Sequence, residues 1–427
     1  MFKGNTRRYG DEKNKLMLST FLGLCLLAIV LFGISNSNIK AKKLSNKQQI
    51  KNIVNHYFTD FYDSLVTYKL PANTEDYIEN NENTYLYKKI LEFDSKSSKN
   101  IGSGFHDYKL KTKYKKLKIF KNKAEVKLLL TVDYHYKEAK DMDSAYYNIK
   151  YDFKLNKKDG KWKIYFIDTN NENYEYFKSE VQQRKKVLKR IKTRSNADPV
   201  RQSIDQTCEE MTDSSETQNE ELKNLTETVD ENRQTPEFRS VSKSYSWKNG
   251  IDYALTYAEK KRIFYVVPNE NDCTNFISQC VWAGYGGYVK GDKKKTKSNM
   301  KNKVRMVSGV WQGGEGGGTG NWESVKSFWS YAIKDKTYGP KGKGYNNNKL
   351  VRTLTNISFG DVIQSKNNKT KNDYKHSAYV SSIEKRLTYV SQHNRRRRSL
   401  SSWINYNGGP GKCYMRRIHF SSAKFSK

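Results

Sequence analysis

The sequence predicts an α+β protein with two folded domains, and three observations support this class. Apolar residues recur at helical spacing from Ile50 to Leu65, and segments that alternate apolar and polar residues follow them. The last third of the chain again combines helical spacing with alternation. Between these parts, residues 178–244 are charged and polar with few aromatic residues. We therefore expect α+β domains at residues 46–177 and 245–427, joined by a linker with some transient helix.

The chain is strongly basic. Its 427 residues include 79 Lys and Arg against 45 Asp and Glu, a formal net charge of +34. Such a charge favours polyanionic partners. Because the lysines are scattered and no nucleic-acid-binding motif occurs, nucleic acid is not the expected partner. Anionic polymers of a cell wall fit the composition better.

A membrane span is expected near the N-terminus. Leu16 to Ser35 contains no charged residue, and about 20 apolar residues are long enough to cross a bilayer. Basic residues on both sides favour a cytoplasmic tail at residues 1–15 only weakly. We interpret residues 16–35 as an uncleaved signal-anchor of a single-pass membrane protein with its bulk outside the cell. Cleavage near Ser35 stays open.

Four cysteines lie outside the expected span: Cys208, Cys273, Cys280 and Cys413. Small secreted domains stapled by disulfides are much denser in cysteine. On one helix, Cys273 and Cys280 would be about 10 Å apart along the axis, too far for a disulfide. The exported part is therefore expected to be poor in disulfides. Cys208, in the linker, has no assigned role.

The first domain is expected to be one long helix followed by a curved antiparallel sheet. Alternating residues from Val126 to Tyr136 share one strand face, and residues from Tyr147 to Leu155 do the same. Asp159-Gly160 predicts a hairpin turn. The arrangement resembles the cystatin-like or nuclear-transport-factor-like cones beside bacterial membrane anchors, although no motif supports this. Residues 46–177 would then hold a ligand, act as a spacer or dock partners of a membrane complex.

The second domain contains DCTNFISQCVWAG, a short apolar helix that begins at Cys273. Phe276, Ile277 and Cys280 share its inward face, Asp272 or Asn271 can cap it, and Gly284, Gly286 and Gly287 end it. The helix N-terminus favours a thiolate, and such sites lower a cysteine pKa from about 8.5 to about 3.5–7.5. Cys273 is therefore a candidate nucleophile. The alternative is a small buried apolar residue.

A nucleophilic cysteine needs a base, and residues 245–427 contain three histidines: His376, His393 and His419. ISFGDVIQS reads as a Gly-Asp turn that feeds a strand. His376 begins the next strand, HSAYV, and YVSQHN ends a third with Gln392, His393 and Asn394. A cysteine at a helix start, a histidine at a strand start and a polar residue on a neighbouring strand are the arrangement of thiol peptidases.

The ordered motifs DCTNFISQC, NWESVKSFWSYAI, FGDVIQ, HSAYV and YVSQHN resemble the bacterial putative amidase domain family over residues 246–427. That family belongs to the papain-like clan of cell-wall peptidases and amidases, which also contains CHAP domains. The resemblance implies Cys273 as nucleophile and His376 as base. For the third residue we favour His393, and Asn394 and Gln392 stay open. Asp272 and Asn275 match the motif, with a structural role favoured over a catalytic one.

Other residues are candidates for substrate or polymer contacts. Trp311, beside a glycine-rich loop, and Asn275 are candidates for binding substrate. The run Arg395–Arg398 either binds wall polyanions or is a solvated surface. There is no HExxH, GxSxG, P-loop or paired-cysteine zinc spacing. No metal or other cofactor is therefore expected.

The leading hypothesis is a membrane-anchored, exported cysteine hydrolase that cleaves amide bonds in peptidoglycan. The alternative is a non-catalytic surface protein of a secretion or conjugation apparatus, with a degenerate wall-binding domain. The intact Cys-His pair favours the enzyme. Which amide bond is cleaved, the oligomeric state and the partners of residues 46–177 stay open.

Overall fold

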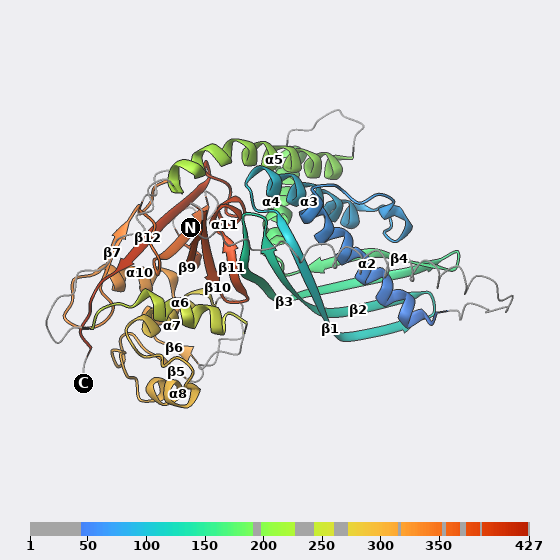
Figure 1. Cartoon of the computed structure of the whole chain (residues 1–427). Helices are drawn as coiled ribbons and strands as arrows, with labels where there is room; N and C mark the ends of the chain where they lie inside the picture. The colour runs from blue at the N-terminus through green and yellow to red at the C-terminus, as the bar shows by residue number, and fades with distance from the viewer. Residues whose placement is uncertain are drawn as a thin grey trace, which may run out of the picture. The chain divides into compact units, whose positions relative to one another are not determined.

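The computed structural model describes residues 44–190, 198–226, 243–259, 272–314, 317–351, 356–367, 373–384 and 387–425. In the N-terminal part, helices precede and follow four antiparallel strands, which pair in the order β1-β2-β3-β4 (Figure 1). Its elements are α2 (Asn46–Thr67), η1 (Thr74–Asp76), α3 (Glu82–Asn100), β1 (Phe105–Phe120), β2 (Lys123–Tyr136), β3 (Ala139–Lys158), β4 (Lys161–Thr169), α4 (Glu172–Arg190) and α5 (Pro199–Thr226).

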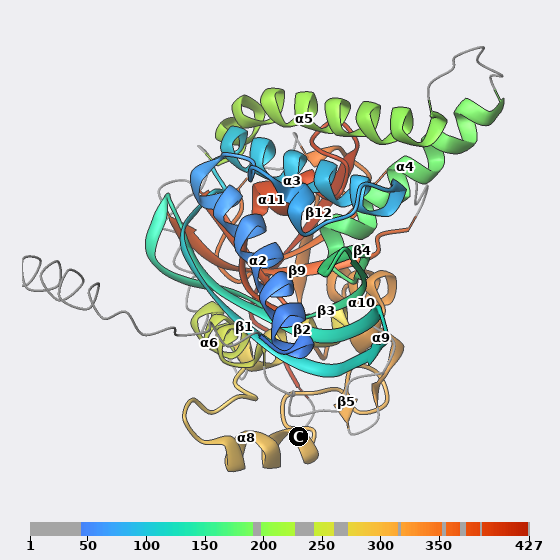
Figure 2. The ribbon, with the colours of Figure 1, turned by 90° about the vertical axis from the view of Figure 1, so that its right-hand side faces the viewer.

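Helix α2 crosses one face of this sheet (Figure 2) because both present matching apolar surfaces. Tyr57 and Phe58 lie edge-on to Phe153 of β3, with ring centroids 5.4 and 5.7 Å apart. The alternating residues of β2, Val126 to Tyr136, are all buried. Asp159 and Gly160 both have positive φ, 49° and 77°, as a two-residue type I′ hairpin requires. The α+β class and this turn are confirmed.

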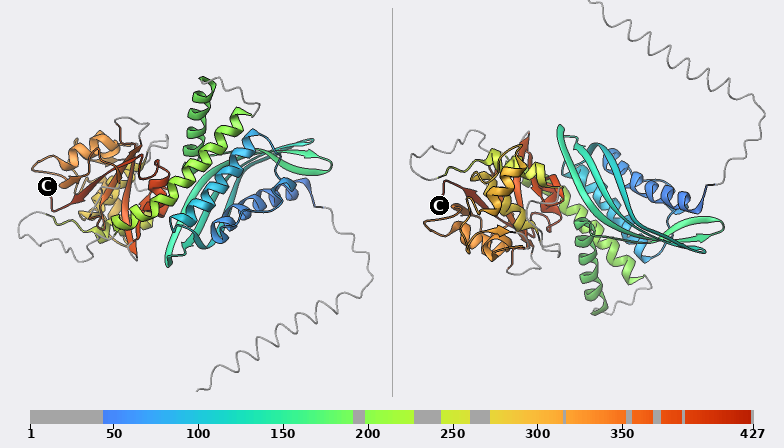
Figure 3. Two further views of the ribbon diagram at one scale, coloured as in Figure 1. Left: turned by 90° about the horizontal axis from the view of Figure 1, so that it is seen from above. Right: turned by 90° about the horizontal axis from the view of Figure 1, so that it is seen from below.

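The expected linker at 178–244 is wrong over most of its length. Within this range α4 occupies residues 178–190 and α5 residues 199–226, and α5 runs beside α3 (Figure 3). Each helix keeps a narrow apolar stripe, and Val181, Ile204 and Cys208 belong to the N-terminal core. Because the rest of each helix is charged, the average composition hid these stripes. Helix α3 and strand β1 were not predicted either.

The C-terminal part contains a mixed set of short helices and the strands β11-β10-β9-β8-β12-β7, which continue the antiparallel sheet of the N-terminal part through the pairing of β11 with β3. Its elements are α6 (Trp247–Tyr257), α7 (Cys273–Gly284), α8 (Lys293–Lys301), β5 (Gly313–Gly314), β6 (Gly317–Gly318), α9 (Gly320–Glu323), α10 (Val325–Ile333), β7 (Gly342–Tyr345), β8 (Val362–Asn367), β9 (His376–Glu384), β10 (Leu387–Gln392), β11 (Arg395–Ser399), α11 (Leu400–Asn405) and β12 (Cys413–Phe420). The three strands expected around the histidines are therefore confirmed.

Helix α7 is the centre of this part, and residues 274–284 are all buried. It contacts α6 and β9. The inward face of α6 consists of the buried residues Gly250, Tyr253, Ala254 and Tyr257, while Ile251 and Leu255 stay partly exposed. On the opposite face of the sheet, Trp403 and Ile404 of α11 cover Ala378 and Val380 of β9.

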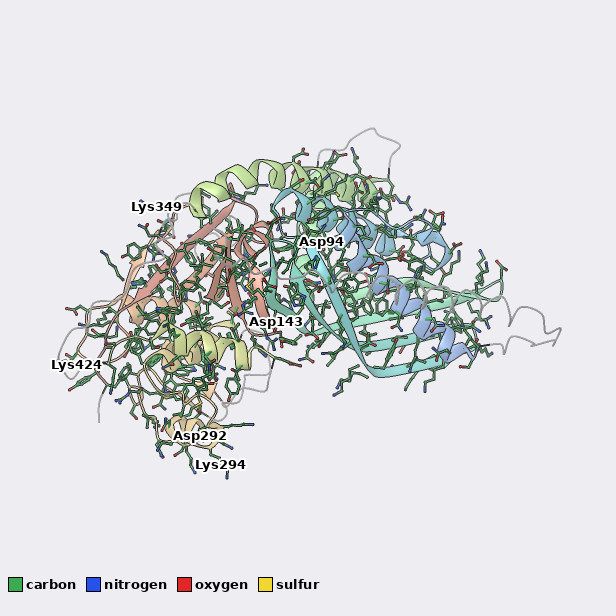
Figure 4. All side chains as sticks on the ribbon, in the orientation of Figure 1. Asp94, Asp143, Asp292, Lys294, Lys349 and Lys424 are labelled. Atoms are coloured by element: carbon green, nitrogen blue, oxygen red, sulfur yellow. The ribbon has the colours of Figure 1, made fainter. Side chains whose placement is uncertain are left out.

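The arginine run Arg395–Arg398 forms β11 and packs against the N-terminal elements. Arg395 and Arg398 are buried, and their guanidinium groups lie 4.6 and 4.7 Å from the ring centroids of Tyr146 and Tyr406. Arg397 Nη1 donates to the carbonyl oxygen of Asp143, 2.6 Å away, on β3 (Figure 4). For Arg395 and Arg398 both alternatives, polyanion binding and a solvated surface, are therefore wrong, because aromatic rings replace water around their charges.

The predicted tail and signal-anchor, residues 1–35, lie outside the described residues. Within the part of the chain that the structure describes, no helix has the length and apolar character needed to cross a bilayer.

Replacing Gly360 by alanine is expected to lower the free energy of unfolding by about 1–3 kcal/mol. Gly360 precedes β8 with a φ of +79°, and an added Cβ would lie 2.6 Å from the Cβ of Trp247. Urea denaturation of the full chain measures the effect. Gly411→Ala is the matched control, because its Cβ would meet nothing within 4 Å. Equal stability of the two variants would contradict this packing.

Candidate active site

Cys273 occupies the first position of α7 and is the one partly exposed residue at the start of an otherwise buried helix. Its Sγ lies 3.8 Å from the hydroxyl of Thr274 and 3.8 Å from the carbonyl oxygen of Lys375. Lys375 immediately precedes β9, so the start of that strand lies against the start of α7. The buried face beyond Cys273 fixes the helix, and the thiol remains at its accessible end.

His376, the first residue of β9, is exposed and hydrogen-bonds to Cys273. Burial of the sulfur raises the pKa of Cys273. The hydrogen bond with His376 and the charge of its imidazolium lower this pKa, as do the Ser377 backbone N–H and the Thr274 hydroxyl, and together they prevail. The pKa of Cys273 is therefore below its ordinary value. Such a thiol is poised to become a nucleophile at a lower pH than a free cysteine.

Two other cysteines show what burial does to a thiol that has no histidine beside it. Burial raises the pKa of Cys208 to about 11. It raises the pKa of Cys413 still further. Both thiols lie in hydrophobic cores. Cys273 differs from them because a histidine and hydrogen-bond donors surround its sulfur.

Of the three candidates for the third residue, His393 has the contact nearest to the nucleophile. Its Nδ1 lies 3.3 Å from Oδ2 of Asp272, the residue before Cys273. His393 and Asn394 form the turn between β10 and β11, and Asn394 adopts a left-handed conformation with φ 64°. The backbone N–H of Asn394 donates to Ala258 at 2.9 Å, and its carbonyl accepts from Tyr147 N–H at 2.9 Å. Gln392 is buried at the end of β10.

A buried polar network supports the N-terminus of α7. Asn275 Nδ2 donates to Asp272 Oδ1 over 2.7 Å, and Asn275 Oδ1 accepts from Gln279 Nε2 at 2.9 Å and from Trp322 Nε1 at 2.7 Å. Tyr253 OH in turn donates to Gln279 Oε1 over 2.5 Å. These residues bind one another, so they position the nucleophile's helix instead of contacting substrate.

This network corrects two expectations. Asp272 holds the N-cap position, but its side chain makes no capping hydrogen bond, because it faces Asn275 and His393. Asn275 is 4% exposed, which excludes the expected direct contact with substrate in this arrangement. The other capping candidate, Asn271, lies outside the described residues.

Trp311 does not line a groove in the described structure. Its side chain is fully buried, and its ring centroid lies 4.7 Å from that of Trp322. The expected role of Trp311 in binding substrate is therefore wrong, because Trp311 and Trp322 pack against each other in the core.

Gln279, Tyr253 and Ser377 were not predicted as parts of the site. Polar residues 272, 275 and 279 recur at helical spacing on a face that the apolar pattern marks as buried, and this was the available signal. Ser377 follows the expected base directly, and its Oγ lies 3.2 Å from Thr274 Oγ1. Among the described residues, no three His, Cys, Asp or Glu side chains are arranged to hold a metal ion.

The comparisons with known proteins agree with this geometry. No curated protein matches the chain. Residues 244–415 match the model of a family described as the putative amidase domain, close to the range 246–427 expected from the motifs. That match supports a hydrolase of amide bonds. The resemblance to the putative amidase domain family is thereby confirmed over residues 244–415.

Proposed function

We propose that the protein is a cysteine-dependent amide hydrolase in which Cys273 is the nucleophile and His376 the base. The observation that carries this proposal is the hydrogen-bonded Cys273–His376 pair, which keeps the pKa of Cys273 below its ordinary value although partial burial of the thiol raises it. The N-terminus of α7 adds a partial positive charge beside the sulfur.

Each step of the reaction uses groups at this site. His376 takes the thiol proton, and the thiolate of Cys273 attacks the amide carbonyl to form a tetrahedral intermediate. The backbone N–H of Cys273 helps to stabilise the oxyanion. The C–N bond then breaks, His376 protonates the leaving amine and a thioester remains. His376 next accepts a proton from water, whose oxygen attacks the thioester and releases a carboxylic acid and the free thiol.

His393 is proposed as the third residue of the site. Its contact with Asp272 joins the β10–β11 turn to the residue before the nucleophile. Through this pair, His393 would hold the start of α7 in place beside β9. Asn394 fits the role less well, because its backbone hydrogen bonds hold the turn. Gln392 fits it less well because it is buried at the end of β10.

Peptidoglycan outside a bacterial membrane is the proposed substrate. The net charge of +34 favours an anionic wall environment, and the apolar stretch from Leu16 to Ser35 would anchor the enzyme beside it. Residues 46–177 would act as a spacer or dock partners in the membrane. A cysteine hydrolase fixed in this way would cleave the wall near its anchor.

Iodoacetamide labelling tests the pair. Cys273 is expected to react first among the cysteines of the described residues, and its labelling rate should have a pH midpoint below about 8.5, the value of a free thiol. In His376→Ala the midpoint should rise, because the two strongest influences that lower the pKa of Cys273, the hydrogen bond and the charge of His376, are lost while burial remains. Peptide mapping by mass spectrometry measures both.

His419→Ala is the control for the loss of a histidine, because His419 contacts Asp361 on another part of the sheet. It should leave the midpoint unchanged. If Cys273 reacts no faster than Cys413, or if its midpoint is the same without His376, the cysteine mechanism is wrong. The assembly-protein alternative would then be preferred.

A further inference from the structure

Two buried cations lie near the candidate active site, and among the described residues neither forms an ion pair with a carboxylate. Lys366 of β8 and Arg416 of β12 are 8% and 6% exposed. Among the described residues, no Asp or Glu oxygen lies within ion-pair distance of either side chain. Buried charges are normally paired, because removal from water disfavours the charged form. Burial accordingly lowers the pKa of Arg416 to about 10.

The neighbours of Arg416 satisfy only part of its guanidinium group. Nε donates to Gln364 Oε1 at 2.8 Å, and Nη1 donates to Asn347 Oδ1 at 3.4 Å. The guanidinium also lies 4.2 and 3.8 Å from the ring centroids of Trp329 and Tyr374. Nη2, in contrast, is buried and has no hydrogen-bond partner among the described residues. The aromatic rings compensate the charge in part, but they leave this donor unused.

Lys366 shares one of these rings, Tyr374, with Arg416. Its Nζ is 5.1 Å from the ring centroid of Tyr374 and 5.4 Å from that of Tyr414. One proton is donated to Asn348 Oδ1, 2.6 Å away, and an ammonium group has two more. Burial and the charge of Arg416 lower the pKa of Lys366, and the carboxylate of Asp373, beyond ion-pair distance, offsets this only in part. The cluster therefore offers two positive groups with unused donors and an aromatic lining.

A chain of hydrogen-bonding side chains connects this cluster with the nucleophile. Gln364, which accepts from Arg416, donates through Nε2 to Ser377 Oγ at 3.2 Å, and Ser377 lies against Thr274. Arg416 pairs with Gln364 and Gln364 pairs with Ser377 across three adjacent strands. Neighbouring strands are about 4.8 Å apart, so Arg416 lies about 10 Å from Ser377 across the sheet. That is about three residues of extended peptide.

We propose that Lys366 and Arg416 form a carboxylate subsite of the active site, and that the substrate is therefore an acidic peptide. The proposal rests on the proposed amide hydrolase function and names its substrate class. The unused donors of Arg416 Nη2 and Lys366 Nζ match the two oxygens of one carboxylate. Because Nη2 is shielded from solvent, binding requires a movement of a neighbouring side chain. The carboxylate would lie about three residues from the scissile amide.

Calorimetric titration of the full chain carrying Cys273→Ala tests the subsite without turnover. The probes are acetylated and amidated pentapeptides of alanine, with one Glu placed at each position in turn, and a matched series with Gln. At least one Glu peptide should bind about tenfold more tightly than its Gln partner. Adding Arg416→Gln or Lys366→Gln should reduce this difference to less than twofold.

Lys294→Gln is the control, because it removes one positive charge at an exposed position on α8 (Figure 4). It should leave the preference intact. Arg416→Lys and thermal unfolding of each variant separate lost binding from lost folding. Equal binding of every Glu and Gln pair, or a preference that survives in a folded Lys366→Gln, would overturn the subsite. Glu preference without Cys273-dependent hydrolysis would instead overturn the proposed function alone.

Discussion

Replacing Cys273 by alanine is expected to lower the rate of amide hydrolysis by at least about 10⁴-fold. Loss of the nucleophile removes the covalent pathway, and enzymes that lose a residue of this kind retain only the contribution of binding and of the oxyanion site. Release of new amine groups from purified peptidoglycan by the full chain measures the rate. The low pKa of Cys273 also predicts that Cys273→Ser is nearly inactive, because a serine hydroxyl is far less acidic than this thiol.

Cys208→Ala is the matched control for this prediction. Cys208 is also a free cysteine, but it is buried in the N-terminal core. Its replacement should reduce stability slightly and leave the hydrolysis rate per folded molecule unchanged. Hydrolysis that persists in Cys273→Ala would show that another group performs the attack.

Replacing Asn275 by leucine should destabilise the protein by about 3–5 kcal/mol, the largest effect on stability that we expect. The change leaves the buried Asp272 carboxylate without its 2.7 Å donor, and it leaves Trp322 Nε1 and Gln279 Nε2 without their shared acceptor. Buried groups deprived of a partner lose the full free energy of hydration. Urea denaturation of the full chain measures the loss.

Asn249→Leu is the control, because Asn249 is exposed on α6. The same substitution there should change the free energy of unfolding by less than about 0.5 kcal/mol. Asn275→Asp provides a second test, since it keeps the shape but places a carboxylate against Asp272. This variant should become more stable as the pH falls and one carboxylate is protonated. A stable Asn275→Leu variant would contradict the network.

The sequence identified the catalytic candidates because their chemistry is local. Cys273 begins a helix whose apolar spacing is regular, and His376 begins a strand with clear alternation, so each position could be assigned without knowing the fold. The contact between the two then followed from the ordered motifs of the family. The Asp159-Gly160 turn could be predicted for the same reason, because only a few residue types accept its backbone conformation.

The predictions were wrong where contacts between distant parts of the chain determine whether a segment folds or a side chain is buried. The charged composition of α4 and α5 suggested a linker, but a stripe of few residues is enough to join a helix to an existing core. Arg395 looks solvent-exposed in sequence and is buried because β11 pairs with β3, some 250 residues earlier in the chain. The sequence around Trp311 likewise fits a residue that lines a groove as well as one that packs in the core. Such positions depend on partners that local patterns do not reveal.

The most direct test of the central claim is to incubate the purified full chain with peptidoglycan in H₂¹⁸O and identify the products by mass spectrometry. The proposed function predicts soluble fragments with a new amine end and a new carboxyl end that carries one ¹⁸O, and it predicts none from Cys273→Ala. The positions of these ends would name the bond that is cleaved. Fragments that also form with Cys273→Ala, or no fragments from a folded protein whose Cys273 reacts with iodoacetamide, would contradict it.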